Sequence, residues 1–221
     1  MYKNEKLLNM ADNAEFTLTS EGKEFTITQL KMGDLFLPTG KIIAYDPVII
    51  FETEPFTCVV PSGHYPVSLS VASMKDNGGL DDKRVAMAMI KFSDKTPVRW
   101  QLAIIEGQED KLDDMGDDDF FGYGVDSGTG GFIDASVAEE LLASRKMDDE
   151  EFFNRISKDF DASYTDTFGY LLTDVIDSGE KNLACFSSGY GDGSYPSYFG
   201  YDDSNEICRL VTDFLVVYTD I

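Results

Sequence analysis

Apolar and polar residues alternate along the first hundred residues in short runs that predict β-strands. Residues 15–19 and 25–28 alternate with a period of two around Ser20-Glu-Gly-Lys23, a pattern typical of a β-hairpin. A further strand over 41–45 ends at Asp46-Pro47, because proline cannot donate to a strand ladder. The remaining predicted strands of this region cover 55–61, 65–71, 84–92 and 98–105.

After residue 131 the apolar residues recur at the spacing of α-helices. Ser136-Val-Ala-Glu139 has the form of a capping box before Leu141 and Leu142. A second helix starts within 148–151 and continues as an apolar stripe of Phe152, Phe153, Ile156 and Phe160. A third is predicted by the spacing i, i+3, i+4, i+7 and i+8, with Gly179 as its stop, for Phe168, Leu171, Leu172, Val175 and Ile176.

Strands resume at 183–186 and over 207–218, so helices interrupt a strand-rich chain. This order predicts an α+β fold: a mostly antiparallel β-sheet with about three helices inserted between residues 134 and 180. The 221 residues suit a single domain over 1–221, with residues 1–37 as peripheral N-terminal strands. The N-terminus does not have the form of a signal peptide, and no apolar run approaches the length of a membrane span.

The three cysteines and the single histidine limit the metal chemistry. Cys58, Cys185 and Cys208 lie in strand-like segments without a Cys-x-x-Cys pair, which indicates reduced thiols in a cytoplasmic protein. With His64 as the only histidine, a His-rich zinc site cannot form. Calcium loops of the EF-hand type fail on spacing from both Asp113 and Asp126. We therefore expect no metal and no cofactor, although irregular calcium or magnesium binding by the Asp-Gly loops stays open.

The net charge of −23 is concentrated in one half of the chain. Residues 1–105 contain 13 acidic and 11 basic side chains, whereas residues 106–221 contain 28 and 7. Part of the excess is a cluster of seven acidic residues between Glu109 and Asp119, relieved by Lys111 alone. Such a charge excludes binding to nucleic acid or to an anionic membrane and favours either a solvated loop or a docking surface for a basic protein.

Catalytic motifs are weak in this sequence. Asp126-Ser-Gly128 and Asp177-Ser-Gly179 resemble the catalytic turns of aspartic proteases, but the copies are too close for two lobes, and the second ends a predicted helix. The chain has no Gly-x-Ser-x-Gly elbow, no phosphate-binding loop and no dinucleotide fingerprint. Whether the protein is an enzyme therefore stays open.

Two glycine-rich loops, 120–134 and 187–202, are the most distinctive segments. They are either tight turns whose tyrosines pack on the sheet, or two parts of one pocket or recognition surface. The candidate binding residues, together with nearby polar and aromatic positions, are Asp126, Ser127, Asp134, Asp192, Tyr195, Tyr198, Asp213, His64, Arg99 and Trp100.

These loops also carry a family resemblance. The relevant motifs are Gly40–Pro47, Pro61–Val67, Arg99-Trp100 with Ala103, Gly124–Thr129 through Asp134, Ser188–Tyr195 with Tyr198, and Asp213-Phe214. In this order, from about residue 38 to the C-terminus, they resemble a bacterial domain-of-unknown-function family numbered 4241. The resemblance implies a stand-alone bacterial protein and no particular activity. The acidic cluster lies outside the motifs.

Two functions follow as hypotheses. The first is a non-catalytic binding or regulatory protein, such as an immunity-type partner, which uses its acidic, Gly/Tyr-rich loop surface to bind a basic protein. The alternative is a small-molecule hydrolase or ligand sensor with an Asp-lined cleft between loops 122–134 and 188–202. In that case Arg99 or Arg84 would orient an anionic group. The oligomeric state is not predicted.

Overall fold

The structure is a computed structural model that describes residues 5–49, 54–75, 81–116, 119–144, 149–175 and 180–218. Its helices are α1 (Glu5–Leu8), the 3₁₀-helix η1 (Glu109–Asp114), α2 (Ala135–Ser144) and α3 (Asp149–Ser163). Its strands are β1 (Glu15–Ser20), β2 (Lys23–Leu37), β3 (Ile42–Tyr45), β4 (Gly63–Lys75), β5 (Asp81–Lys91), β6 (Arg99–Leu102), β7 (Gly122–Val125), β8 (Thr129–Asp134), β9 (Tyr170–Asp174), β10 (Asn182–Ser187), β11 (Gly193–Tyr201) and β12 (Ile207–Asp213).

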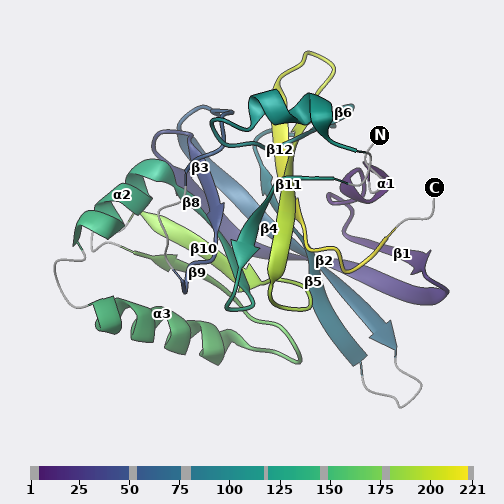
Figure 1. Ribbon diagram of the computed structural model, residues 1–221. Coiled ribbons are helices and arrows are strands. Elements are labelled where there is room, and N and C mark those ends of the chain that lie inside the picture. The colour runs from purple at the N-terminus through teal and green to yellow at the C-terminus, as the bar shows by residue number, and fades with distance from the viewer. Residues whose placement is uncertain are drawn as a thin grey trace.

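The strands form two antiparallel sheets. The larger has the order β1-β2-β4-β5-β12-β11-β6, and β7 pairs with β11 beyond the end of β6. The smaller has the order β3-β8-β10-β9 and packs against the larger sheet, with α2 and α3 on its outer side (Figure 1). The predicted mostly antiparallel α+β fold is confirmed at this level.

The smaller sheet is buried on both faces, and the alternation of its side chains shows why. Phe132 and Phe186 belong to the core between the two sheets, whereas Ile133, Leu183 and Cys185 belong to the core beneath the helices. Ile156 and Phe160 of α3 complete the second core, as their helical spacing predicted. The side chains of Phe152 and Phe153 lie outside the described part of the chain.

The N-terminal segment is built into the larger sheet. The predicted hairpin joins β1 to β2, and its turn residues Glu21 and Gly22 both have positive φ, at 49° and 76°, as a two-residue hairpin turn requires. β1 forms one edge of the sheet, but β2 is an interior strand with buried Ile27. The N-terminal turn also contributes to the core through fully buried Leu7.

The third predicted helix is wrong: residues 170–174 form strand β9, which pairs with β10. Phe168, Tyr170 and Leu172 pack on the core between the sheets, whereas Leu171 and Val175 pack on the core beneath the helices. A strand covered on both faces has few polar positions, so its apolar residues can imitate helical spacing. Ile176 and Gly179, the predicted end of the helix, lie outside the described residues, as does the second Asp-Ser-Gly.

Three further sequence predictions differ from the structure. Residues 55–61, predicted as a strand, make isolated bridges at Phe56 and Val59 instead. α2 begins at Ala135, so its N-cap is Asp134 and not the predicted Ser136. Residues 214–218 follow β12 without continuing the strand. Within the described part of the chain, no helix is long and apolar enough to cross a membrane.

Candidate functional site

The two glycine-rich loops meet, and they do so through their backbones. β7 runs antiparallel to the first half of β11, with Val125 opposite Gly193 and Tyr123 opposite Tyr195. The Ser188 N–H donates to the Gly128 carbonyl oxygen at 3.0 Å, which joins the adjoining turns. Strand β7 of the first loop therefore extends the edge of the larger sheet by pairing with β11 of the second loop.

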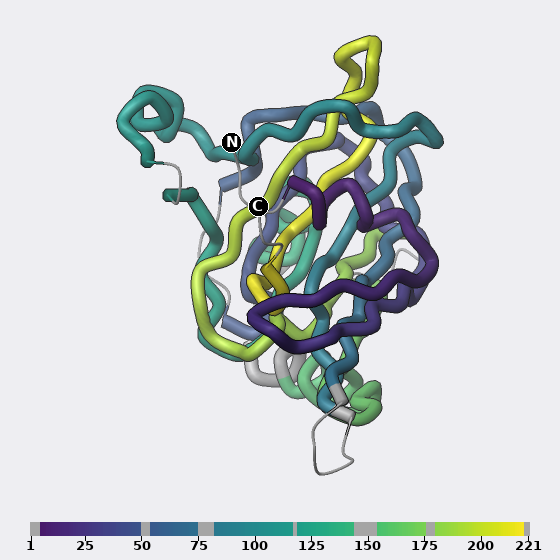
Figure 2. Tube along the Cα trace, turned by 90° about the vertical axis from the view of Figure 1, so that its right-hand side faces the viewer, coloured from purple at the N-terminus to yellow at the C-terminus, as the bar shows by residue number. Residues whose placement is uncertain are grey.

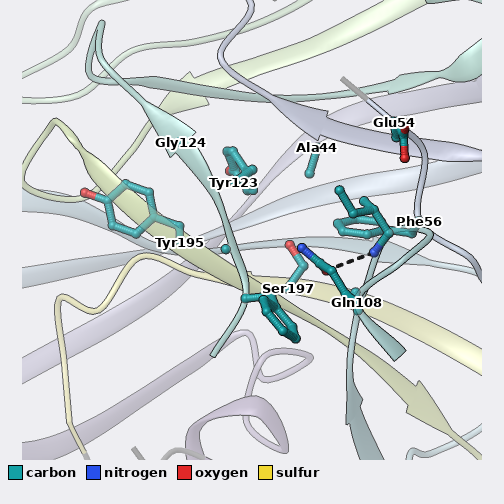
Figure 3. A pocket seen from close by; sticks show the side chains of 12 residues that line it. Ala44, Glu54, Phe56, Gln108, Tyr123, Gly124, Tyr195 and Ser197 are labelled. Atoms are coloured by element: carbon teal, nitrogen blue, oxygen red, sulfur yellow. Dashed lines mark hydrogen bonds between the residues drawn. The ribbon is translucent and has the colours of Figure 1, made fainter. Parts of the chain in front are cut away.

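A cavity of about 240 Å³ lies where the loops meet, beside the gap between β6 and β7 on β11 (Figure 3). Its walls are largely apolar and aromatic, and its lining comprises Ala44, Glu54, Phe56, Ala103, Ile105, Gln108, Phe121, Gly122, Tyr123, Gly124, Tyr195 and Ser197. Of the ten candidate residues, only Tyr195 lines this cavity. Asp126 and Asp192 do not line it, so it is not the Asp-lined cleft of the alternative hypothesis.

The hydroxyl groups around the cavity are mostly engaged elsewhere. The Tyr195 hydroxyl donates to the Gly191 carbonyl oxygen at 2.7 Å, and the Ser197 and Thr212 hydroxyls are 2.7 Å apart. The Tyr123 hydroxyl is buried near Thr212 without hydrogen-bond geometry to any described group. Burial raises the pKa of both tyrosines, so their hydroxyls stay neutral. None of these groups is paired with a general base.

Gln108 and Glu54 are the other polar side chains of the cavity. The Gln108 Oε1 accepts a hydrogen bond from the Ile105 N–H at 3.1 Å, while its amide nitrogen lies on the cavity side (Figure 3). Glu54 is exposed at one end of the cavity. Local sequence patterns did not indicate either residue, because both lie outside the two loops and reach the cavity only through the fold.

Asp134 is fully buried and holds two chain segments together. Its carboxylate accepts hydrogen bonds from the backbone N–H groups of Thr39, Gly40 and Ser136 at 2.9–3.1 Å. The Thr39 and Ser136 hydroxyls donate to it as well, at 2.9 and 2.7 Å. Asp134 thus caps α2 and anchors the turn before β3, which is a structural role.

Asp46 plays the same role for the first glycine-rich loop, although it was not among the candidate residues. Its carboxylate accepts from the backbone N–H groups of Asp126 and Ser127 at 2.9 and 2.8 Å, and from the Ser127 hydroxyl at 2.7 Å. It also accepts from the Val48 N–H at 2.9 Å and the Ile49 N–H at 3.2 Å. The sequence feature that could have indicated Asp46 is its position before Pro47, at the end of a predicted strand. We call the hydrogen bonds from residues 126–127 to Asp46 a loop clamp. Ser127 is part of this clamp, whereas the Asp126 side chain is exposed.

The remaining candidates are dispersed. Asp213 is fully buried and accepts from the Leu215 N–H at 2.9 Å, whereas Asp192 is exposed. His64 is exposed and stacks on Phe36, with ring centroids 4.4 Å apart. These positions do not converge on one another.

Arg99, Trp100 and Tyr198 line a second hollow, a groove of about 460 Å³ between β6 and η1. The Arg99 guanidinium lies 4.0 Å from the ring centroid of Tyr201 and donates to Asn205 at 2.8 Å. The Trp100 indole N–H donates to Asn9 at 2.8 Å. The polar groups of Arg99 and Trp100 therefore hold neighbouring segments.

The acidic cluster forms an exposed projection that we call the acidic segment, residues 106–116 and 119. Its centre is η1, which stands out from the body of the protein (Figure 2). Gln108 is the N-cap position of η1 and also lines the cavity, so the acidic segment starts at the cavity wall. Apart from Lys111, every charged side chain of the segment is acidic. Among the described residues, no group of three or more potential ligands is placed to hold a metal ion.

Fold and site together define an antiparallel α+β protein with an aromatic-lined cavity at the edge of its larger sheet. The chain belongs to a family described as "Protein of unknown function (DUF4241)", whose model matches residues 35–212. The resemblance noted from the sequence motifs is thereby confirmed, and the matched range also contains the acidic segment. No curated protein and no solved structure matches the chain.

Proposed function

We propose that this protein is a non-catalytic binding protein of the regulatory or immunity type, which recognises a basic protein partner through the acidic segment and the adjoining loop surface. The observation that carries the proposal is the contrast between two sets of acidic residues. The carboxylates of Asp46 and Asp134 already accept hydrogen bonds from the backbone of the loops that they hold in place. The acidic side chains of the exposed segment project into solvent beside an open aromatic cavity.

The electrostatics favour a positively charged partner. Acidic side chains clustered on a projection make the local electrostatic potential strongly negative, which attracts a basic surface and speeds its encounter. Exposed charges are screened by salt, so such an association weakens at high ionic strength. A binding role also agrees with the dispersal of the candidate catalytic groups, since His64 and Asp192 lie apart from the cavity.

The test compares two charge-reversal variants in which the net charge changes equally. The first, Asp110→Lys with Asp113→Lys, alters the acidic segment. The second, Asp159→Lys with Asp161→Lys, alters exposed positions at the C-terminal end of α3, at the opposite end of the protein (Figure 1). Each protein is used as bait in an extract of the native host, and the captured proteins are identified and quantified at low and high salt.

We expect the native protein and the α3 variant to retain the same basic protein at low salt and to release it at high salt. The acidic-segment variant should fail to retain it, with an unchanged melting temperature. Equal capture by both variants, or a partner whose binding ignores salt, would contradict the proposal.

A ligand sensor is the second candidate, and the cavity is the observation that favours it. Binding of a small neutral molecule there would depend on the cavity lining and would tolerate both high salt and reversal of the acidic segment. The same two variants therefore separate this candidate from the first.

A further inference from the structure

We infer that the cavity between the loops receives an arginine side chain of the basic partner, so this inference rests on the proposed function. It concerns the cavity, which adjoins the acidic segment at Gln108. The acidic segment attracts a basic partner over a distance, whereas the cavity binds one particular arginine side chain of that partner. Interfaces commonly derive most of their binding energy from a few such buried aromatic or arginine anchors.

The size of the cavity suits one side chain. A cavity of about 150 Å³ can hold a benzene molecule. The present cavity, at about 240 Å³, has room for a longer group that enters end-on. The backbone at Gly122 and Gly124 forms part of its wall, and a Cβ atom added to Gly124 would meet no atom within 4 Å. The space beside Gly124 is therefore unfilled.

The chemistry of the lining suits a planar cation. Phe56, Phe121 and Tyr123 offer aromatic surface, and the exposed Glu54 supplies a carboxylate at one end. No lysine or arginine is among the described residues that line the cavity. A guanidinium group stacks on aromatic faces and pairs with a carboxylate through two parallel hydrogen bonds. The ammonium group of lysine is more strongly hydrated and loses more on entering an apolar site.

Gln108 supports the orientation of the incoming residue. Its Oε1 is fixed by the Ile105 N–H, which leaves its amide nitrogen on the cavity side (Figure 3). No described hydrogen bond engages that nitrogen, so it can donate to the backbone carbonyl oxygen of the inserted arginine. Because Gln108 also precedes η1, an arginine bound here would bring the rest of a basic surface against the acidic segment.

The probe for this inference is N-acetyl-arginine amide, titrated into the full-length protein and followed by ¹H–¹⁵N NMR. We expect a dissociation constant of about 1–10 mM, as is usual for a ligand of this size. Shifts should be concentrated at Gly122, Gly124 and the Gln108 side-chain amide. N-acetyl-lysine amide should bind at least about fivefold more weakly, because its ammonium group is harder to desolvate.

Two variants test the contacts. Glu54→Gln should weaken binding of the arginine probe by about three- to fivefold, the effect of one exposed ion pair. Asp159→Asn, which removes an exposed charge near the C-terminal end of α3 and away from the cavity lining, is the matched control and should leave the affinity within about twofold. Ala44→Leu should fill the cavity and abolish binding, with the melting temperature measured to confirm folding. If Ala44→Leu does not fold, the Glu54 pair still provides the test.

The absence of localised shifts with the arginine probe would overturn the inference. So would equal binding of N-acetyl-leucine amide, which would make the cavity a general apolar site. Neither result affects the proposed function, because the salt-dependent capture test alters only the acidic segment and leaves the cavity intact.

Discussion

Asp134→Asn is the substitution whose effect follows most directly from the structure. The Asp134 carboxylate is fully buried, and five donor groups from two chain segments point at it. Asparagine has nearly the same shape but carries one acceptor oxygen and one NH₂ group. If the oxygen keeps the bonds from Thr39 and Gly40, the NH₂ group faces the N–H of Ser136, which is left without an acceptor.

The expected cost is the sum of two effects. A buried backbone N–H that loses its partner costs about 1–3 kcal/mol. Loss of the negative charge at the start of α2 removes a further contribution of about 0.3–1 kcal/mol from the helix dipole. Hydroxyl groups can rotate to accept from the new NH₂ group, which recovers part of the loss. We therefore expect Asp134→Asn to lower the free energy of unfolding by about 2–3 kcal/mol.

Urea denaturation followed by circular dichroism measures this change, with equal slopes required for a valid comparison. Asp126→Asn is the matched control, because the Asp126 side chain is exposed and its change should stay within about 0.5 kcal/mol. A cost below about 1 kcal/mol for Asp134→Asn would show that this buried carboxylate does not hold the two segments as we argue.

Three further predictions concern other parts of the molecule. Gly40→Ala should lower the melting temperature strongly, because Gly40 has a φ of +71° and an added Cβ would lie 1.7 Å from the Val60 carbonyl oxygen; an unchanged melting temperature would contradict this geometry. A charged alkylating reagent should modify Cys58 first in the native protein, since Cys185 and Cys208 are buried. Mass spectrometry of the native and the urea-unfolded protein measures which thiols react. Early modification of a second cysteine in the native protein would refute the prediction. Burial, the largest cause, raises the pKa of Tyr201 from 10.0 to about 12, so the stability that this neutral hydroxyl contributes is complete below pH 10 and is lost as the pH rises towards 12. Tyr201→Phe should therefore lose less stability between these pH values than the native protein, and equal losses would count against the assignment.

The strands could be predicted where one face of the pattern differs from the other. The hairpin at residues 15–28 has clear alternation and a turn with the expected positive φ values, and both strands and turn are found in the structure. The same reasoning failed at β9, because this strand is covered by the larger sheet on one side and by helices on the other. A pattern with few polar residues cannot distinguish the two periods, and only the pairing with β10 decides between them.

The positions of the acidic side chains could not be predicted for a different reason. Asp134 bonds to Thr39, which lies 95 residues away, and Asp46 bonds to Ser127, which lies 81 residues away. A carboxylate that clamps a loop and one that lines a cleft have the same local sequence, since both follow an apolar strand and precede small polar residues. The Asp-Ser-Gly motif at Asp126 therefore marks the end of β7 and the clamp to Asp46.

This assignment of the carboxylates bears on function, because an acceptor can serve only one set of donors at a time. A carboxylate that already receives four or more protein hydrogen bonds, as Asp46 and Asp134 do, cannot take a proton from a substrate without releasing the loops that it holds. Proton transfer to Asp46 or Asp134 would thus release the loop segments that these two side chains hold. Binding a partner would not disturb these hydrogen bonds, since Glu54 and the acidic segment can pair with a partner while Asp46 and Asp134 keep theirs. Under the proposed function, the buried acidic residues keep the loop surface rigid and the exposed ones attract the partner to it.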